Sequence, residues 1–207
     1  MSEQIKSKQR VSDHGEVFTR PEEVNAMLNL VKNETIRVDS RFLEPACGDG
    51  NFLLEILKRK LEVIAKTLAK SQKEFEFQSV IAIASLYGIE LLQDNVETCR
   101  TRLFNLLAEK YNLIFSRNIS NEYAEIIKFI LEKNIILGDA LKMTFVETNW
   151  PIVFSQWSPV NQPRKWSIKR HDYEYQYLIA QSGSPYKSVQ QYFSCYFMDI
   201  KNAQPIN

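Results

Sequence analysis

Cysteine and histidine are scarce in this 207-residue chain, which has three of the first and two of the second. Cys47, Cys99 and Cys195 lie far apart and form no Cys-x-x-Cys pair. A disulfide framework and a structural zinc site are therefore not expected, and no metal is predicted. Reduced thiols of this kind are typical of a cytoplasmic protein.

Excess charge and long apolar runs are also missing. The formal net charge is +1, so no global basic field draws the chain to nucleic acid, and a DNA contact would need a local patch or a partner. The first 16 residues are polar and lack the apolar centre of a signal peptide. The remaining apolar stretches are too short or too interrupted to span a membrane, so no membrane partner is expected.

What the sequence does contain is an alternation of short apolar strands and amphipathic helices. Strands are predicted at 41–45, 86–90, 134–139 and 151–155. Helices are predicted at 21–32 with Thr19 as its cap, 52–68, 94–111 and 122–132, and 78–85 either extends the second helix or forms another. This order predicts a mostly parallel α/β sheet covered by helices on both faces.

The composition divides the chain into three parts. Residues 1–15 are polar and predicted to be flexible, and residues 16–155 form the α/β core. Residues 156–207 form a divergent aromatic and basic C-terminal part. Within it, residues 157–197 are rich in Trp, Tyr, Gln and Ser and show no clean periodicity, so neither helix nor strand is assigned to them.

The clearest motif is the segment LEPACGDGNF at residues 43–52, which reads as a strand, a glycine turn and the start of a helix. Gly48 and Gly50 allow positive φ or a close approach of backbone to a ligand. Glu44 and Asp49 would repel a phosphate and suit a ligand with a cationic end, and the Gly-x-Gly-x-x-Gly pattern of dinucleotide sites is absent. The alternative is a tight turn with solvated acids.

Two further acids end the next two predicted strands. Glu90 stands where Rossmann-type sheets place an acid that accepts hydrogen bonds from ribose hydroxyls. Asp139, followed by Ala140, ends the third strand and would suit an adenine amino group. Because the carboxyl ends of parallel strands meet at one crevice, these acids are expected to converge, unless each merely begins a loop.

These motifs resemble those of gamma-type N6-adenine DNA methyltransferases, the modification enzymes of restriction–modification systems. Residues 15–21, GEVFTRP, resemble that family's N-terminal motif, and residues 43–52 resemble its cofactor motif. The resemblance covers roughly residues 15–140 and implies a Rossmann-like, three-layer methyltransferase fold, complete or lacking its C-terminal strands. It implies S-adenosyl-L-methionine as cofactor, contacted by Phe18, Thr19, Glu44, Ala46, Gly48, Asp49, Gly50, Glu90, Asp139 and Ala140.

The family's next motif, Asn-Pro-Pro-Tyr, has no good counterpart here. It holds the amino group of a flipped adenine and stacks on the base. Ser158 and Pro159 fall where it should follow the fourth strand, and they match it poorly. Asn149-Trp150-Pro151 contains an asparagine and a proline but precedes that strand.

A mixture of basic and aromatic residues marks the C-terminal part. Arg164, Lys165, Lys169 and Arg170 lie among tryptophans and tyrosines, a composition that binds nucleic-acid backbone and bases or forms a solvated loop beside an aromatic cluster.

Three functions remain open. The first is a DNA adenine-N6 methyltransferase or modification subunit. The second is a non-catalytic cofactor-binding subunit of a defence complex, with a partner subunit that supplies target recognition. The third is a methyltransferase for RNA or protein.

Overall fold

The computed structural model describes residues 5–161, 164–179 and 188–207. The helices have these bounds: α1 Lys8–His14, α2 Pro21–Leu30, α3 Lys32–Thr35, α4 Asn51–Val63, the π-helical turn η1 Ile64–Leu68, α5 Gln72–Ala84, α6 Gln93–Phe115, α7 Asn121–Asn134, α8 Tyr175–Ile179 and the 3-10 turn η2 Phe197–Asn202. The strands have these bounds: β1 Phe42–Glu44, β2 Leu86–Glu90, β3 Ile135–Asp139, β4 Thr144–Phe145, β5 Val153–Val160, β6 Ser167–Glu174, β7 Gln190–Tyr192, β8 Cys195–Tyr196 and β9 Pro205–Ile206.

The first sheet has the order β1-β2-β3-β4. Its first three strands are parallel, with Phe42 opposite Leu86 and Gly88 opposite Ile135, and β4 runs antiparallel to β3. The carboxyl ends of β1, β2 and β3 therefore lie at one edge of the sheet. The predicted α/β class, with its parallel strands and intervening helices, is confirmed.

Helices cover one face of this sheet. α4 packs on β1 and β2, and α6 packs on β2 and β3. Buried leucines at helical spacing supply the contact on α4 (Leu53, Leu57, Leu61), as their period predicts. The segment 78–85 belongs to a separate helix, α5, which packs with α7 and η1.

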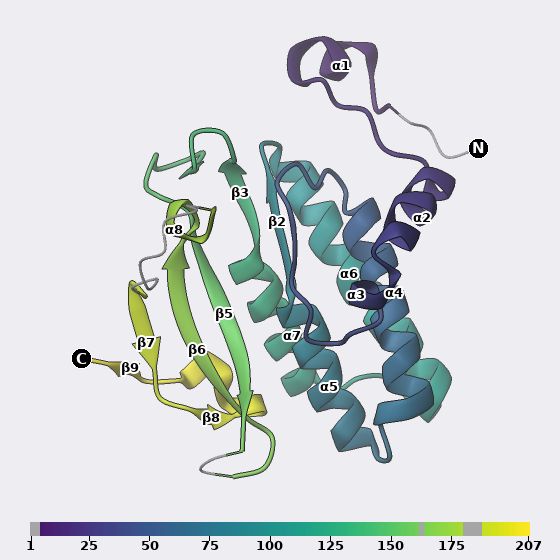
Figure 1. Ribbon diagram of the computed structural model, residues 1–207, viewed down its shortest axis with the longest axis vertical. Coiled ribbons are helices and arrows are strands. Elements are labelled where there is room, and N and C mark those ends of the chain that lie inside the picture. The colour runs from purple at the N-terminus through teal and green to yellow at the C-terminus, as the bar shows by residue number, and fades with distance from the viewer. Residues whose placement is uncertain (1–4, 162–163, 180–187) are drawn as a thin grey trace.

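The other face is covered by strands, and here the prediction of helices on both faces is wrong. A second sheet with the order β5-β6-β7-β9, and β8 paired to β6, lies against it. Figure 1 shows the two sheets side by side, with α4 and α6 beyond the first, whereas α5 and α7 also contact β5 of the second. Tyr87 of β2 joins them, because its ring packs edge-on against Phe154 at 5.3 Å and its hydroxyl donates to the Ser155 carbonyl at 3.2 Å.

The predicted fourth strand is longer than expected and does not extend the parallel sheet. β5 continues through Ser158 and Pro159 to Val160 and pairs antiparallel with β6 over its whole length. It points away from the edge where β3 ends (Figure 1). The expectation that Ser158 and Pro159 follow the fourth strand is therefore wrong, and the residues after 156, for which the sequence predicted neither helix nor strand, contribute to β5 and form β6 to β9. β5 also crosses the predicted domain boundary at 155 without a break.

The N-terminal residues, predicted to be flexible, include a helix. Residues 8–14 form α1, which lies at the end of the molecule where β2 and β3 terminate (Figure 1). The cap of α2 is Arg20 rather than Thr19, with Pro21 in the first turn as expected. Within the described ranges, none of the helices combines the length and the apolar character that a membrane crossing requires.

Candidate functional site

The glycine turn joins β1 to α4 beside the end of β2. Gly48 and Gly50 both have positive φ, at 52° and 94°, and Gly50 is the N-terminal cap of α4. A side chain at Gly50 would place its Cβ 2.6 Å from the Cys99 sulfur of α6. The turn is anchored to β2 because the Cys47 amide donates to the Ile89 carbonyl at 3.0 Å. Sterics and backbone conformation thus both require glycine at residue 50.

Glu90, at the end of β2, holds this turn in place. Its Oε2 accepts from the Gly48 amide at 2.9 Å, and its Oε1 accepts from the Leu92 amide at 3.1 Å. The residue is 9% exposed. The Asn95 side chain also donates to Oε1, at 3.4 Å. A carboxylate offers about four acceptor positions, so these three donors leave capacity for a hydroxyl donor of a ligand.

Asp139 ends β3 at the same edge. Its Oδ1 accepts from the amides of Leu141 and Lys142, both at 3.0 Å, and its Oδ2 lies 3.2 Å from the Lys142 ammonium. The Lys142 amide is the main reason that the pKa of this carboxyl is below its usual range. Asp139 therefore presents an ionised acceptor beside β2.

A cavity of about 330 Å³ lies where these three strands end. It brings together six of the predicted cofactor residues: Phe18, Ala46, Gly48, Glu90, Asp139 and Ala140. The other lining residues were not predicted individually: Gly15, Glu16, Val17, Pro45, Leu91, Leu92, Gly138 and Leu141. The first four lie inside the motifs at 15–21 and 43–52, and the rest stand within two positions of a predicted residue along the chain.

Phe18 closes one side of the cavity. A Cβ on Gly48 would come 3.2 Å from the Phe18 ring, so the ring lies against the glycine turn. The neighbouring Thr19 does not line the cavity; its carbonyl accepts from the Asn51 side chain at 3.1 Å and fastens this segment to α4.

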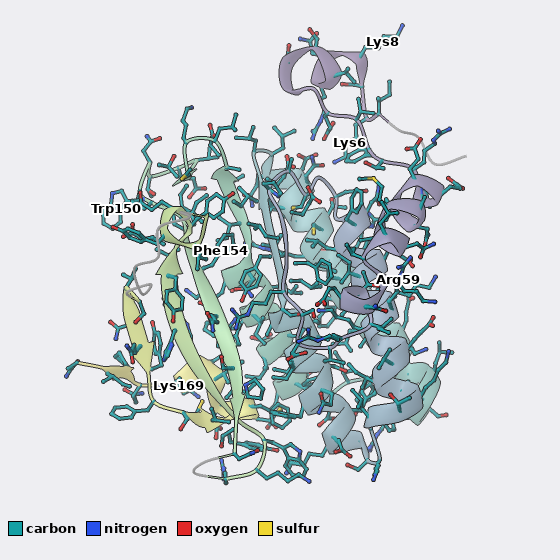
Figure 2. All side chains as sticks on the ribbon, in the orientation of Figure 1. Lys6, Lys8, Arg59, Trp150, Phe154 and Lys169 are labelled. Atoms are coloured by element: carbon teal, nitrogen blue, oxygen red, sulfur yellow. The ribbon has the colours of Figure 1, made fainter. Side chains whose placement is uncertain are left out.

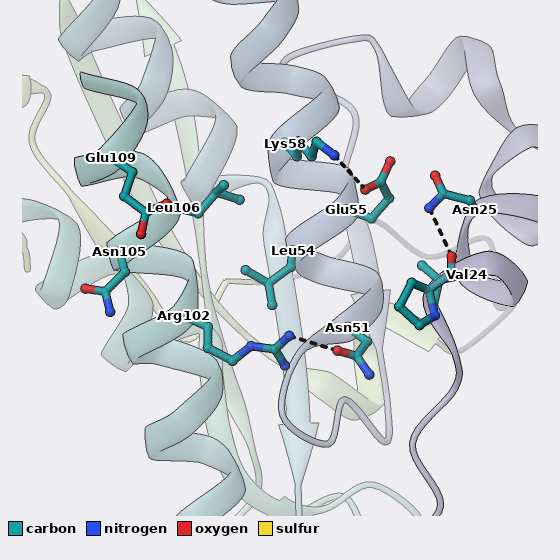
Figure 3. Close-up of a pocket in the computed structure, with 11 residues that line it drawn as sticks. Val24, Asn25, Asn51, Leu54, Glu55, Lys58, Arg102, Asn105, Leu106 and Glu109 are labelled. Atoms are coloured by element: carbon teal, nitrogen blue, oxygen red, sulfur yellow. Dashed lines mark hydrogen bonds and ion pairs between the residues drawn. The ribbon is translucent and has the colours of Figure 1, made fainter. Parts of the chain in front are cut away.

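Asp49 points elsewhere. Its carboxylate pairs with Arg102 of α6 at 2.6 Å, and Arg102 also donates to the Asn51 side chain at 3.0 Å. Figure 3 shows Arg102 reaching Asn51 in a different pocket, of about 450 Å³, between α2, α4 and α6. The other oxygen of Asp49, Oδ1, is buried and has no hydrogen-bond partner among the described residues.

Two more predicted residues, Glu44 and Gly50, lie outside the cavity lining. Glu44 is half-buried, and burial raises the pKa of its carboxyl, while the Ala46 amide acts in the opposite direction. Gly50 serves the turn itself. The structure thus gathers the ends of β2 and β3 around the cavity and leaves the two acids of the glycine motif, Glu44 and Asp49, outside its lining.

The N-terminal segment is tied to the same edge by a network of charges. Arg10 pairs with Glu16 at 2.6 Å and with Asp94 at 2.9 Å, and Lys6 pairs with Asp94 at 2.9 Å. The side chain of Asn95 donates to Glu16 at 2.6 Å. Because Glu16 lines the cavity, this network positions one wall of it.

Ser158 and Pro159 are not brought to the cavity. They lie inside β5, opposite Lys169 and Ile168 of β6, toward the end of the molecule away from Asp139. Their expected position after a strand at the carboxyl edge is wrong, because the strand continues through them into an antiparallel hairpin.

The four basic residues of the C-terminal part do not act as one exposed patch. Arg170 is buried, pairs with Asp172 at 2.7 Å, and stacks over the Tyr192 ring at 4.2 Å. Arg164 lies 3.4 Å from Asp199, and Lys165 lies over the Trp166 ring at 4.7 Å. Lys169 precedes Arg170 on β6 and is half-buried on the opposite face of the strand. Arg170 is therefore not exposed for contact with nucleic acid, and it lies within an aromatic cluster instead.

Comparison with known proteins identifies a family. The family model described as "MmeI, DNA-methyltransferase domain" matches residues 19–202, which is most of the chain. No curated protein and no solved structure matches the chain. The chain therefore belongs to the MmeI DNA-methyltransferase domain family.

Proposed function

We propose that this member of the MmeI DNA-methyltransferase domain family binds S-adenosyl-L-methionine and serves adenine-N6 methylation of DNA in a restriction–modification system. The cavity at the ends of β1, β2 and β3 carries the proposal, because residues from four separate motifs line it: Phe18, Gly48, Glu90 and Asp139. Its position supports a Rossmann-like core with residues 16–155 as the cofactor-binding part.

The donor and acceptor groups of the cavity fit this cofactor. Glu90 would accept hydrogen bonds from the ribose hydroxyls, and Asp139 would accept from the adenine amino group. Phe18 offers a ring face to the adenine. The volume of about 330 Å³ falls within the range of small-molecule sites. When bound, the cofactor supplies an electrophilic methyl group, and this chain would bind and orient it.

A second candidate is a cofactor-binding subunit that needs a partner polypeptide for methyl transfer. One observation favours it: Ser158 and Pro159 lie inside β5, opposite β6 and outside the cavity lining. A partner would then supply the groups that hold the target base. We propose a cytoplasmic location for either form. The third candidate is a methyltransferase that acts on RNA or protein.

Calorimetric titration with S-adenosylmethionine and S-adenosylhomocysteine tests the cofactor proposal. We expect saturable binding, weakened at least tenfold in Phe18→Ala and Asp139→Asn by loss of a ring contact and of a charged acceptor. Glu109→Gln, in the pocket between α2, α4 and α6, is the control and should bind as the parent does.

Binding that is unchanged in both cavity variants would reject the site. Labelled methyl transfer to DNA, RNA and protein, with the isolated chain, then separates the two candidates. Transfer to DNA by this chain alone would reject the partner-dependent form, and cofactor binding without transfer would favour it.

A further inference from the structure

A second cavity, of about 630 Å³, lies between α6, α7, the first half of β3 and the start of β5. Its inner surface is apolar, with Ile136, Leu137 and Phe145. Trp150, which is 74% exposed, also lines the cavity. Figure 2 shows Trp150 at the periphery of the molecule, beside the strand ends. The cofactor site proposed above does not include this cavity.

The hairpin backbone holds Trp150 in its exposed position. Its carbonyl accepts from the Phe145 amide at 2.9 Å, and Pro151 forms a bridge with Thr144. Asn149 precedes it with a φ of 56°, the left-handed conformation that asparagine tolerates at turns. The indole is thus presented by an ordered turn, where its face is free to receive a cation.

Three carboxylates line the same cavity as this indole. Glu132, Glu147 and Glu174 line the cavity, and none of them forms an ion pair with a Lys or Arg of the described residues. The cation of the described lining is Arg100, whose guanidinium donates to the backbone carbonyls of Ile135, at 2.5 Å, and Glu132, at 3.3 Å. The cavity therefore combines an apolar floor, an open aromatic face and an excess of negative charge.

We propose that this cavity binds a basic segment of a protein partner, with an arginine or lysine side chain inserted between Trp150 and the carboxylates. Charge complementarity selects the occupant: a cation is attracted by the carboxylates and by the indole face, and the apolar floor accepts its aliphatic stem. A DNA backbone is disfavoured, since its phosphates would meet Glu132, Glu147 and Glu174.

The position of the cavity gives such a partner access to the proposed cofactor site. Leu137 lines this cavity, and the next three residues, 138–140, line the cofactor cavity. Gln93 lines this cavity, and Leu92 lines the other. A partner held at Trp150 therefore contacts the same two loops that surround the ends of β2 and β3.

The test uses a small probe and the chain without cofactor, so that its outcome is independent of cofactor binding. The probe is N-acetyl-arginine methyl ester, and the matched control probe is N-acetyl-citrulline methyl ester, which has nearly the same shape without the charge. The NMR signal of the Trp150 indole N–H is followed during titration and is assigned by its disappearance in Trp150→Phe.

We expect the arginine ester to shift the Trp150 signal saturably and the citrulline ester to bind at least threefold more weakly. Glu147→Gln and Glu174→Gln should each raise the Kd by about threefold, the effect of one partly exposed charge pair. Glu109→Gln removes a carboxylate from the pocket between α2, α4 and α6 and should leave the Kd unchanged.

Three results would overturn the proposal: equal binding of the two esters, Glu147→Gln and Glu174→Gln variants that both bind as the parent does, or no shift of the Trp150 signal up to saturating probe. If duplex DNA instead of the ester shifts the same signal in a salt-sensitive way, the cavity binds nucleic acid and the proposal of a protein partner is rejected.

Discussion

Replacing Gly50 with alanine should destabilise the protein through two separable effects. The first is backbone strain, because Gly50 has a φ of 94° and an L-residue in the left-handed region costs about 1–2 kcal/mol. The second is overlap, because the new Cβ would lie 2.6 Å from the Cys99 sulfur, and overpacking costs about 1–3 kcal/mol. The expected loss in the free energy of unfolding is therefore about 2–5 kcal/mol.

Gly15 supplies the matched control. It has a φ of 65°, but a Cβ there would have no atom within 4 Å in the described structure. Gly15→Ala should therefore lose only the strain part, about 1–2 kcal/mol. Urea unfolding of both variants measures the difference, provided that the transitions are two-state.

A double variant isolates the overlap. Cys99→Ala removes the sulfur, so the cost of Gly50→Ala measured in that background should fall by about 1–3 kcal/mol. If Gly50→Ala costs the same in both backgrounds, and no more than Gly15→Ala, the close approach of α6 to the glycine turn is not what restricts residue 50.

Three further predictions concern charge. Burial lowers the pKa of Lys60 from the ordinary 10.5 to about 7, so between these pH values the unfolded chain binds one proton more than the folded chain. The free energy of unfolding should therefore rise from pH 7 to pH 9, as measured by the midpoint of urea unfolding, and Lys60→Met should show a smaller rise. Arg10 lowers the pKa of Asp94 to about 2, so the Arg10–Asp94 ion pair persists at neutral pH. Asp94→Asn removes this pair and should therefore speed amide hydrogen exchange across α1. Added salt should speed the exchange in the parent protein and leave it unchanged in Asp94→Asn. Asp172→Ala leaves the Arg170 charge buried and should cost about 3–5 kcal/mol, whereas Arg170→Met combined with Asp172→Leu should cost less in urea unfolding.

The sequence was sufficient to predict an element of the fold where one local pattern of residues determines that element. The apolar run before Glu90 predicts β2, the glycine turn marks the start of α4, and the acid at Asp139 marks the end of β3. These positions follow from neighbouring residues alone, because strand, turn and helix signals occur in immediate succession. The convergence of Glu90 and Asp139 on one edge then follows from the parallel order of the strands.

The second sheet was missed because its buried positions are largely polar. Ser155, Ser167, Arg170 and Asp172 are all buried on β5 and β6. The Asp172 carboxylate satisfies the others in part, since it accepts from Ser155 at 2.8 Å and from Arg170. Such a network hides the apolar–polar alternation by which a strand is recognised. The side chain of Asp49 points toward Arg102, and this could not be predicted either, because Arg102 lies 53 positions away along the chain.

Glu90 has two functions in the proposed site, and they constrain how it is tested. Its carboxylate would receive the cofactor, and it already accepts from the amides of Gly48 and Leu92. In Glu90→Gln one oxygen becomes an NH₂ group, so one of these two amides would face a donor and lose its partner, at a cost of about 1–3 kcal/mol. Loss of affinity in this variant would therefore report the collapse of the turn together with the loss of a ribose contact. Phe18 and Asp139 separate the two effects, because neither accepts a hydrogen bond from the Gly48 amide. Weakened binding in those variants, with the unfolding midpoint unchanged, is the result that only a ligand contact explains.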